Sequence, residues 1–201
     1  IKKYWEKNIF PQSGSLMFAD FWNKTLHDGV VEVSAPTLES AVFAADISKA
    51  VSAVKAIKGN GIELELVQNM SVGAGVGADN PWLQETPDAI TKITWDNYVM
   101  MNPSEMRDAG YETHFDQENA MNVLEVVANG AKIQLPVIPQ PGQAKGTISI
   151  ALGYGKKVGN MEEPTGKNAY PLVSATKTGV SYYASGVTTT DVEMDEPYHI
   201  A

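Results

Sequence analysis

An Asn-Gly dipeptide between two stretches of β-branched and aliphatic residues constrains the fold of this chain more than any other feature. Residues 123–127 are Val-Leu-Glu-Val-Val, residues 132–137 are Lys-Ile-Gln-Leu-Pro-Val, and Asn129-Gly130 lies between them. A two-residue type I′ turn needs positive φ at both central positions, and Asn followed by Gly satisfies that need well. The sequence therefore predicts a β-hairpin that turns at Asn129-Gly130.

Two further stretches are typical of strands. Residues 62–67 alternate apolar and polar side chains, which indicates a strand buried on one face. Residues 147–152 are Thr-Ile-Ser-Ile-Ala-Leu and follow the turn residues Pro139 and Pro141-Gly142, which favours a more deeply buried strand. Residues 92–95 and 98–100 are also expected to be strands, residues 30–33 to be extended, and weaker strand signals occupy residues 170–174 and 179–183.

Helical patterns are concentrated near the N-terminus. Residues 15–27 carry apolar side chains at helical spacing, and Gly29 can end that helix. Residues 46–58 form a second helix with Asp46 as its N-cap, and Pro36 could begin another. A short helix is expected at residues 103–109, before Gly110. These patterns predict an α+β chain, mainly β, with a helical N-terminal extension (residues 1–61) and a β-barrel domain (residues 62–201).

Composition excludes several classes of function. The 201 residues carry 24 acidic and 15 basic side chains, and the resulting net charge of −9 disfavours nucleic acid and anionic membranes as partners. There is no cysteine, so this chain itself offers no disulfide, iron–sulfur ligation or thiol catalysis. No apolar run approaches the roughly 18 residues of a membrane-spanning helix, so no direct membrane insertion is expected. Because the chain lacks an initiator Met, we expect it to be one domain of a longer protein.

Known catalytic and metal-binding patterns are missing from the sequence. The histidines His27, His114 and His199 are far apart and have no acidic residue at metal-ligand spacing, so no metal ligand is predicted. No serine lies in a nucleophile-elbow pattern, and no catalytic residue is predicted. Residues 73–78 match the Gly-x-Gly-x-x-Ala form of a dinucleotide loop, but Pro81 and Pro87 oppose the helix that such a loop needs, which favours a simple flexible loop.

Two groups of side chains leave a binding function open. Four aromatic residues could stack on a heterocyclic cofactor, although buried aromatic rings more often supply core contacts. They are Trp82, Trp95, Tyr98 and Tyr154. We expect Trp82 and Trp95 to share one buried cluster. An acidic run near the C-terminus is either a solvated face or a docking surface for a basic partner. It consists of Asp191, Glu193, Asp195 and Glu196.

Three passages in order resemble a known family. Residues 80–88 are Asn-Pro-Trp-Leu-Gln-Glu-Thr-Pro-Asp, residues 95–97 are Trp-Asp-Asn, and residues 141–155 run from Pro-Gly to Gly-Tyr-Gly. With the hairpin between them, they resemble the C-terminal domain of molybdopterin oxidoreductases. The likeness is strongest to a branch without a molybdenum site, the molybdopterin-like part of the iron–sulfur subunit of bacterial alternative complex III. It is closest over residues 62–155 and weaker at residues 21–29 and from residue 168 onward.

The resemblance implies a double-psi β-barrel that acts as a non-catalytic scaffold in a respiratory, quinol-oxidising complex. Such a domain would be peripheral, on the periplasmic side of the bacterial inner membrane, with other domains and subunits of the complex as partners. Iron–sulfur clusters would lie elsewhere in the parent chain, and this segment would hold no cofactor. We also expect either the helix at residues 15–27 or residues 191–198 to contact the rest of the parent protein.

Two alternatives remain open at this point. The first is the cofactor-binding domain of an active molybdopterin oxidoreductase, in which one end of the pterin dinucleotide would be lined by Asn80, Trp82, Gln84, Gly153, Tyr154 and Gly155. The loop at residues 71–79 contains no Arg, Lys or His, and burying a pyrophosphate without a cation is costly, which favours the cofactor-free branch. The second alternative is a free-standing periplasmic binding module.

Overall fold

The computed structural model describes residues 1–33, 43–56, 59, 61–114, 116, 119–177 and 179–200. The chain divides into two compact units, Ile1–Val51 and Ser52–Ala201. The division falls about ten residues before the predicted boundary, inside a helix. The helix expected from Pro36 lies outside the described residues, as do the last two residues of the helix expected at 46–58.

Within residues 1–33 of the first unit, the structure has two short helices and one 3-10 turn, α1 (Lys2–Asn8), η1 (Phe10–Gln12) and α2 (Phe18–Asp28). α2 confirms the helix predicted at residues 15–27, and Gly29 ends it in the left-handed conformation. Residues 30–33, which were expected to be extended, form no strand. The unit is held by edge-to-face and tilted ring contacts, whose members are Trp5, Phe10, Phe18, Phe21 and Trp22.

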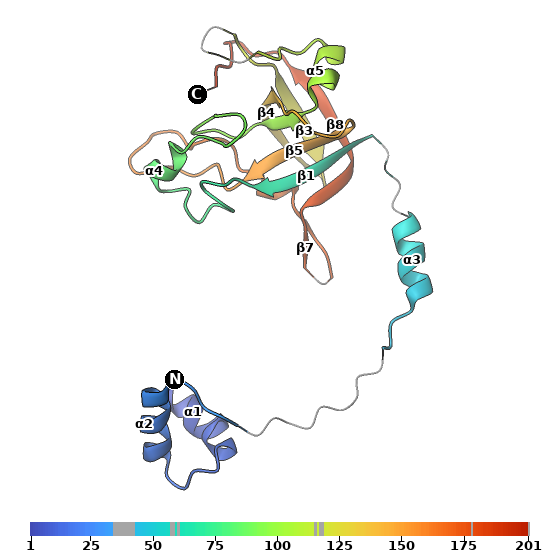
Figure 1. The fold of residues 1–201 in the computed structure, drawn as a ribbon. Helices are drawn as coiled ribbons and strands as arrows, with labels where there is room; N and C mark the ends of the chain where they lie inside the picture. The colour runs from blue at the N-terminus through green and yellow to red at the C-terminus, as the bar shows by residue number, and fades with distance from the viewer. Residues whose placement is uncertain are drawn as a thin grey trace. The chain divides into compact units, whose positions relative to one another are not determined.

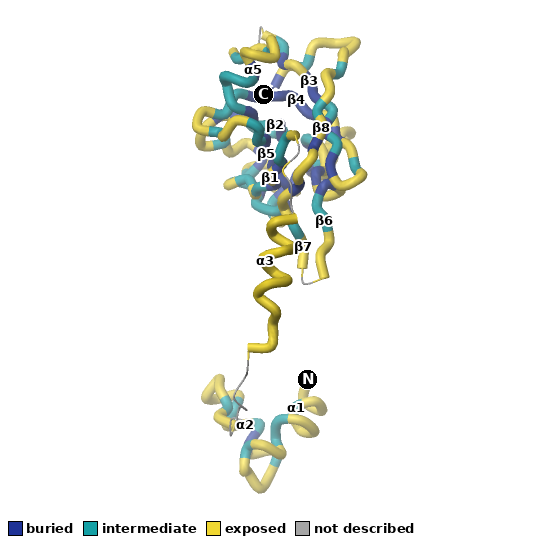
Figure 2. Tube along the Cα trace, turned by 90° about the vertical axis from the view of Figure 1, so that its right-hand side faces the viewer, coloured by how far each residue is buried: buried dark blue, intermediate teal, exposed yellow. Residues whose placement is uncertain are grey.

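Helix α3 (Ile47–Ala56) confirms the helix predicted after Asp46. The Asp46 carboxylate accepts a hydrogen bond from the backbone N–H of Lys49 at 3.1 Å, which is the N-cap contact that the sequence indicated. The apolar side chains of this helix are nevertheless exposed, and none of its residues is buried (Figure 2). An amphipathic pattern therefore forms a helix here without covering its apolar face.

Six strands close into a barrel in the order β1-β5-β2-β4-β3-β8 (Figure 1). β1 runs parallel to β5, β2 runs parallel to β4, and the other neighbours in the barrel are antiparallel. The barrel strands are β1 (Ile62–Gln68), β2 (Val99–Met101), β3 (Val123–Ala128), β4 (Ala131–Pro139), β5 (Thr147–Leu152) and β8 (Tyr183–Val192). A separate two-stranded sheet pairs β6 (Ser174–Ala175) with β7 (Val180–Ser181). The fold of this unit is thus mainly β, with a closed six-stranded barrel.

The hairpin prediction is confirmed. β3 and β4 pair in antiparallel register, with Val126 opposite Ile133, and only Asn129 and Gly130 connect the strands. Both turn residues have positive φ, 51° and 78°, as a type I′ turn requires. The Asn129 side chain also donates to the carbonyl of Leu172 at 2.7 Å, so the turn is tied to a distant segment of the chain.

Three strand predictions are wrong or incomplete. Residues 92–95 form no strand, because Lys92 and Trp95 adopt left-handed φ values of 66° and 61°. Residues 170–172 form a 3-10 helix, η2 (Tyr170–Leu172), so the strand expected at 170–174 is reduced to β6. The strand expected at 179–183 is divided between two strands. Val180 and Ser181 form β7 of the separate sheet, and Tyr183 begins β8, which continues to Val192 and closes the barrel between β1 and β3.

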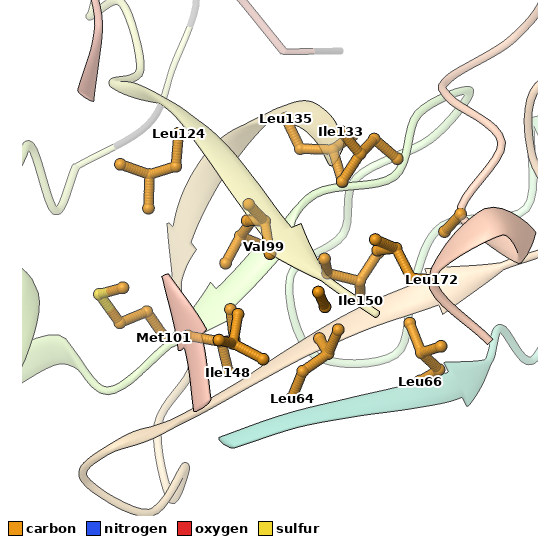
Figure 3. Close-up of a cluster of buried hydrophobic side chains, with 14 of the residues drawn as sticks. Leu64, Leu66, Val99, Met101, Leu124, Ile133, Leu135, Ile148, Ile150 and Leu172 are labelled. Carbon is orange, nitrogen blue, oxygen red and sulfur yellow. The ribbon is translucent and has the colours of Figure 1, made fainter. Parts of the chain in front are cut away.

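Aliphatic side chains from all six strands fill the interior of the barrel. Leu64, Leu124 and Ile150, which Figure 3 labels, come from β1, β3 and β5, belong to one cluster and are fully buried. Helix α5 (Pro103–Ala109) adds Met106 to the same core, and Gly110 ends this helix as predicted. A small barrel packed in this way leaves its binding surfaces to the loops at its ends.

Candidate functional site

All six candidate cofactor residues lie at one end of the barrel. β1 and β5 are parallel, so the loops that follow Gln68 and Leu152 leave the barrel at the same end. β2 is antiparallel to β5, so the segment that leads into Val99 arrives at that end as well. The topology thus brings together residues 69–98 and 153–170, which are far apart in sequence, with helix α4 (Pro81–Gln84) among them (Figure 1).

Two glycine loops pack backbone against backbone at this end. A Cβ at Gly153 would lie 2.7 Å from the nitrogen of Gly75 and 2.9 Å from the oxygen of Gly73, so no side chain fits there. A Cβ at Gly155 would lie 2.5 Å from the nitrogen of Asn168. The Gly-Tyr-Gly passage singled out in the sequence is therefore covered by other parts of its own chain.

A lysine distant in sequence supplies a positive charge to the first glycine loop. Lys156 Nζ donates to the carbonyl of Gly75 at 2.7 Å. The sequence showed no cation between residues 71 and 79, but the fold brings one there from the loop after β5. The expectation that no cation lies near this loop is therefore wrong, because it considered only residues adjacent in the sequence. Tyr170 holds the same loop by donating its hydroxyl proton to the carbonyl of Ala74 at 2.6 Å.

Helix α4 presents Trp82 to solvent. Asn80 caps the helix through its side-chain oxygen, which accepts from the backbone N–H of Trp82 at 3.0 Å, and Pro81 occupies the first helical position. Residues two apart on a helix face different sides, so burial of Gln84 leaves the Trp82 ring outside, 81% exposed. The expected buried cluster of Trp82 and Trp95 is therefore wrong. Pro81 starts this short helix instead of preventing one.

Gln84 is the buried anchor of that helix. Its side chain is only 2% exposed, and Nε2 donates to the carbonyl of Ala78 at 2.8 Å. Its Oε1 atom is buried without a hydrogen-bond partner. The backbone carbonyl of Gln84 accepts a hydrogen bond from the backbone N–H of the half-buried Trp95 at 3.1 Å. Gln84 therefore joins the glycine loop to the Trp-Asp-Asn passage.

Asn97 cross-links three segments at this end of the barrel. The side chain is fully buried, and Nδ2 donates to the carbonyls of Ala151 and Lys167, each at 3.0 Å. Its Oδ1 accepts from the backbone N–H of Lys167 at 2.8 Å. These contacts fix the long loop after β5 against the strand itself. The sequence marked Asn97 as part of a motif, but contacts 54 and 70 residues away leave no local pattern that would reveal them.

Buried acidic and phenolic groups surround Asn97. Tyr198 donates a short hydrogen bond to Asp96 Oδ2, and burial raises the pKa of both groups. Thr91 and Tyr98 share a hydrogen bond of 2.6 Å between their hydroxyl oxygens, and burial raises the Tyr98 pKa. Burial also raises the pKa of Tyr154 to about 12. The Asp96–Tyr198 and Thr91–Tyr98 hydrogen bonds join segments of these loops to one another.

The C-terminal segment is bound to the same network. Apart from the Tyr198–Asp96 contact, the carbonyl of Tyr198 accepts from the backbone N–H of Met121 at 2.8 Å. Asp191 lies in β8, opposite Leu124, and all four acidic residues of the run are exposed. This arrangement fits the solvated-face interpretation of the acidic run.

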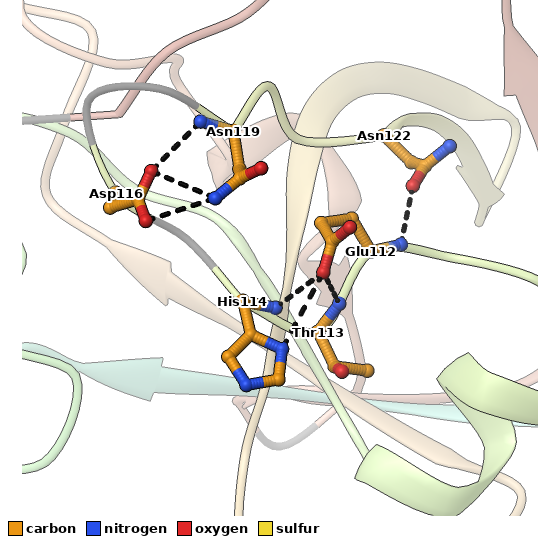
Figure 4. Close-up of polar contacts among 6 residues, drawn as sticks. All are labelled: Glu112, Thr113, His114, Asp116, Asn119 and Asn122. Atoms are coloured by element: carbon orange, nitrogen blue, oxygen red, sulfur yellow. Dashed lines mark hydrogen bonds and ion pairs between the residues drawn. The ribbon is translucent and has the colours of Figure 1, made fainter.

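The exposed loop after α5 holds the second histidine. The Glu112 carboxylate accepts from the backbone N–H groups of Thr113 and His114, both at 2.8 Å, while Asp116 pairs with Asn119 (Figure 4). His27 contacts Asp28 on the exposed end of α2. Within the described ranges, no group of three or more His, Asp or Glu side chains could hold a metal ion. The helices of the described part are also too short or too polar to cross a membrane.

The six candidate residues therefore occupy four different environments. The Asn80 amide oxygen is engaged as a helix cap, Trp82 is exposed, Gln84 and Tyr154 are buried, and the two glycines are pressed against backbone. They share one end of the barrel, but they do not present a common open surface to a pterin dinucleotide. In this conformation they do not fit that cofactor.

Comparison with known proteins does not assign the chain to a family. No family model matches the sequence, and no curated protein matches it. One solved structure that it resembles is acetylene hydratase from Pelobacter acetylenicus, with a TM-score of 0.36 and 13% sequence identity. The similarity covers 83% of this chain and 22% of that chain, so the present chain spans about a fifth of the matched protein's length. Agreement at this level supports no conclusion about function.

Proposed function

We propose that this chain is a non-catalytic scaffold domain of an electron-transfer complex and that its barrel is a double-psi barrel of the molybdopterin oxidoreductase type. The family resemblance of the Asn-Pro-Trp, Trp-Asp-Asn and Gly-Tyr-Gly passages motivates the proposal. Two parallel pairs, β1–β5 and β2–β4, within an otherwise antiparallel closed barrel are compatible with that topology. The parent assembly would be a quinol-oxidising respiratory complex on the periplasmic side of the inner membrane, with iron–sulfur clusters carried outside this domain.

The packing of Gly153 against the backbone of Gly73 and Gly75 is the observation that supports the non-catalytic part of the proposal. A cofactor that rested on Gly153 would need the space now taken by the backbone of Gly73 and Gly75. Gln84 and Asn97 are the polar side chains most deeply buried near these glycines. Both donate hydrogen bonds to backbone carbonyls of their own chain. These groups stabilise loops, and they leave no described constellation that could transfer protons, electrons or a chemical group to a substrate.

Metal and pterin analysis of the native protein tests this proposal. The protein should be isolated from the cells that make it, together with whatever polypeptides accompany it. We expect molybdenum and tungsten far below one atom per chain and no pterin fluorescence after oxidative release. An active molybdopterin enzyme prepared in parallel is the control. Stoichiometric metal with pterin bound to this chain would contradict the proposal.

One observation favours the alternative of an active cofactor-binding domain. Lys156 places a positive charge beside Gly75, and the unpartnered Oε1 of Gln84 could accept a hydrogen bond from a bound group. Under this alternative the loop at residues 71–79 must move away from Gly153 when the cofactor binds. The metal and pterin analysis separates the two functions, because only the alternative requires a bound pterin.

A further inference from the structure

The loop that carries the Asn-Pro-Trp passage combines a fixed backbone with an exposed aromatic ring. Backbone N–H groups of Leu83 and Gln84 donate to the carbonyl of Asn80 at 3.1 and 3.2 Å, in addition to the side-chain cap by Asn80. At the other end of the helix, Thr86 Oγ1 donates to the carbonyl of Trp82 at 2.9 Å. Both ends of α4 are therefore held by local hydrogen bonds.

Buried contacts hold the inner side of the same helix. Gln84 is bound to the Ala78 carbonyl, and Leu83 Cδ1 occupies the space where a Cβ on Gly77 would stand, 2.5 Å away. The Trp82 ring therefore extends from a backbone that has little freedom left to lose. An aromatic side chain fixed in this way binds a partner at a small cost in conformational entropy, which is why Trp is enriched among the residues that dominate interfaces.

The surroundings of Trp82 indicate the chemistry of its partner. Val76 and Met70, in the preceding loop, are also exposed, at 93% and 84%. Residues 76–88 contain three acidic side chains and no Lys or Arg, and the ammonium group of Lys156, which the fold brings to this loop, is engaged with the carbonyl of Gly75. Asp88 is engaged with the backbone of Ile90 and Thr91, whereas Asp79 and Glu85, which flank the helix, are exposed. Acidic flanks of this kind repel an anionic lipid surface and favour a protein surface with basic groups.

We propose that Trp82 is the anchor of a protein docking surface, bordered by Asp79 and Glu85, and that its partner is a different polypeptide with an apolar cleft beside Lys or Arg residues. The identification of this partner as another part of the electron-transfer complex rests on the proposed function. In the partner's cleft the indole ring would lose its contact with water, while the two carboxylates would pair with the cations at the edge. The cofactor-lining role of Trp82 is not needed to explain its exposure.

Photo-crosslinking of the full chain in the cells that make it tests the surface. A benzophenone amino acid is placed at position 82 in one variant and at position 180 in the control, because Val180 is also exposed but lies in the separate β6–β7 sheet. We expect position 82 to cross-link a different polypeptide at least about tenfold more efficiently than position 180. The cross-linked peptide should contain apolar residues beside Lys or Arg.

Charge reversal supplies the matched control. Glu85→Lys should lower the cross-linking yield from position 82 several-fold, whereas Glu163→Lys, at another exposed acid, should leave it unchanged. Trp82→Ser, without the photoreactive group, should reduce the amount of co-isolated partner at least about tenfold, as expected for loss of a dominant interface residue. Its thermal unfolding should match that of the unchanged protein, because the ring is exposed.

Several results would overturn the docking surface. They are equal cross-linking from positions 82 and 180, cross-links from position 82 only to a second copy of this chain, or full retention of the partner by the Trp82→Ser variant. If the chain still co-isolates with other polypeptides in these cases, the scaffold function stands and only the docking surface is wrong. If no other polypeptide accompanies the chain, both proposals are wrong.

Discussion

The barrel and the N-terminal 33 residues contain similar apolar side chains but bury them to different extents. In the barrel, Leu64, Leu124 and Ile150 are 0% exposed, and each strand contributes to one continuous core (Figure 3). In residues 1–33, Phe21 is the one buried side chain, and Leu16 and Leu26 are 99% and 64% exposed. The barrel closes on itself, so its apolar faces meet. The short helices have no opposing layer of their own and rely on a few ring contacts.

This difference separates local structure from burial. α3 begins with the Asp46 cap, α2 ends at the left-handed Gly29, and both have the apolar spacing of ordinary amphipathic helices, yet α3 buries none of its residues. An apolar face that remains exposed on a locally well-formed helix is what a partner surface requires. The barrel thus accounts for the stability of the chain, while its N-terminal helices and Trp82 account for its expected contacts.

Truncation of a core side chain of the barrel should give the largest loss of stability. A small loss would contradict the difference drawn between the barrel and the N-terminal residues. Leu124→Ala removes a fully buried side chain from the barrel, and we expect a loss of about 2–5 kcal/mol in the free energy of unfolding. Leu16→Ala, at a 99% exposed position, should change it by less than about 0.5 kcal/mol. Chemical denaturation of both variants provides the measurement. Similar losses would show that the N-terminal unit also has a core.

Substitution of Gly153, which packs against the backbone of Gly73 and Gly75, should reduce stability nearly as much. Gly153→Ala places a methyl group 2.7 Å from the Gly75 nitrogen at a φ of +98°, and we expect a destabilisation of roughly 2–4 kcal/mol from overlap and backbone strain together. Gly142→Ala is the matched control, because its φ is +87° but no atom lies within 4 Å of the added Cβ. It should cost only about 1 kcal/mol. Equal denaturation midpoints would mean that the two loops separate readily, as a cofactor would require.

The hairpin turn should show an intermediate effect. Gly130→Val puts a β-branched residue at a φ of 78°, where no neighbouring atom obstructs it, so the expected loss of about 1–3 kcal/mol comes from backbone strain alone. Urea denaturation followed by circular dichroism measures the loss. A neutral result would show that the turn adopts another conformation in solution.

The smallest effects should come from two carboxyl groups with opposite pH dependence. Burial raises the pKa of Asp96, so its contribution to stability is present below the ordinary aspartate pKa and is lost as the pH rises through the raised value. Asp96→Asn should remove that loss and flatten the stability profile above about pH 4.

Glu112 provides the contrast. Backbone N–H groups of His114 and Thr113 lower the pKa of this exposed carboxyl, so its contribution is present above the ordinary glutamate pKa and is lost as the pH falls through the lowered value. Glu112→Gln should therefore affect only the acidic side of the profile. Thermal unfolding between pH 3 and pH 8 would distinguish the two variants, and profiles that change on the same side would contradict the assignment.

The parts of the fold that local sequence determines were predictable. The Asn129-Gly130 hairpin, the Asp46 cap and the helix before Gly110 each depend on a few adjacent residues. β8 was largely missed because residues 184–192 carry polar Thr and Ser side chains that the barrel pairs on both edges. Lys92 and Trp95 interrupt an apparently extended passage at positive φ, where their backbone N–H groups donate to the carbonyls of Asp88 and Gln84.

The sequence could predict which residues gather at the candidate site but not how they are arranged there. The motifs identified residues that do gather at one end of the barrel, since parallel pairing of β1 and β5 brings their following loops together. The sequence could not show that Lys156 reaches Gly75, that Gly153 packs on Gly75, or that Trp82 faces outward. The contacts of Lys156 and Gly153 with Gly75 join segments far apart in the sequence, whereas Trp82 faces outward because Gln84, two residues further along the helix, is buried.

Hydrogen exchange of the chain alone and in its native complex tests the central claim most directly. The barrel strands should be protected equally in both samples, because their core is complete within this chain. Residues 76–85 should gain protection only in the complex, since they carry the proposed docking residue Trp82, and residues 18–28 should do so as well if α2 is the segment that contacts the rest of the parent protein. Identical exchange in both samples at α2 and at the Trp82 loop would show a self-sufficient module and would contradict the scaffold function.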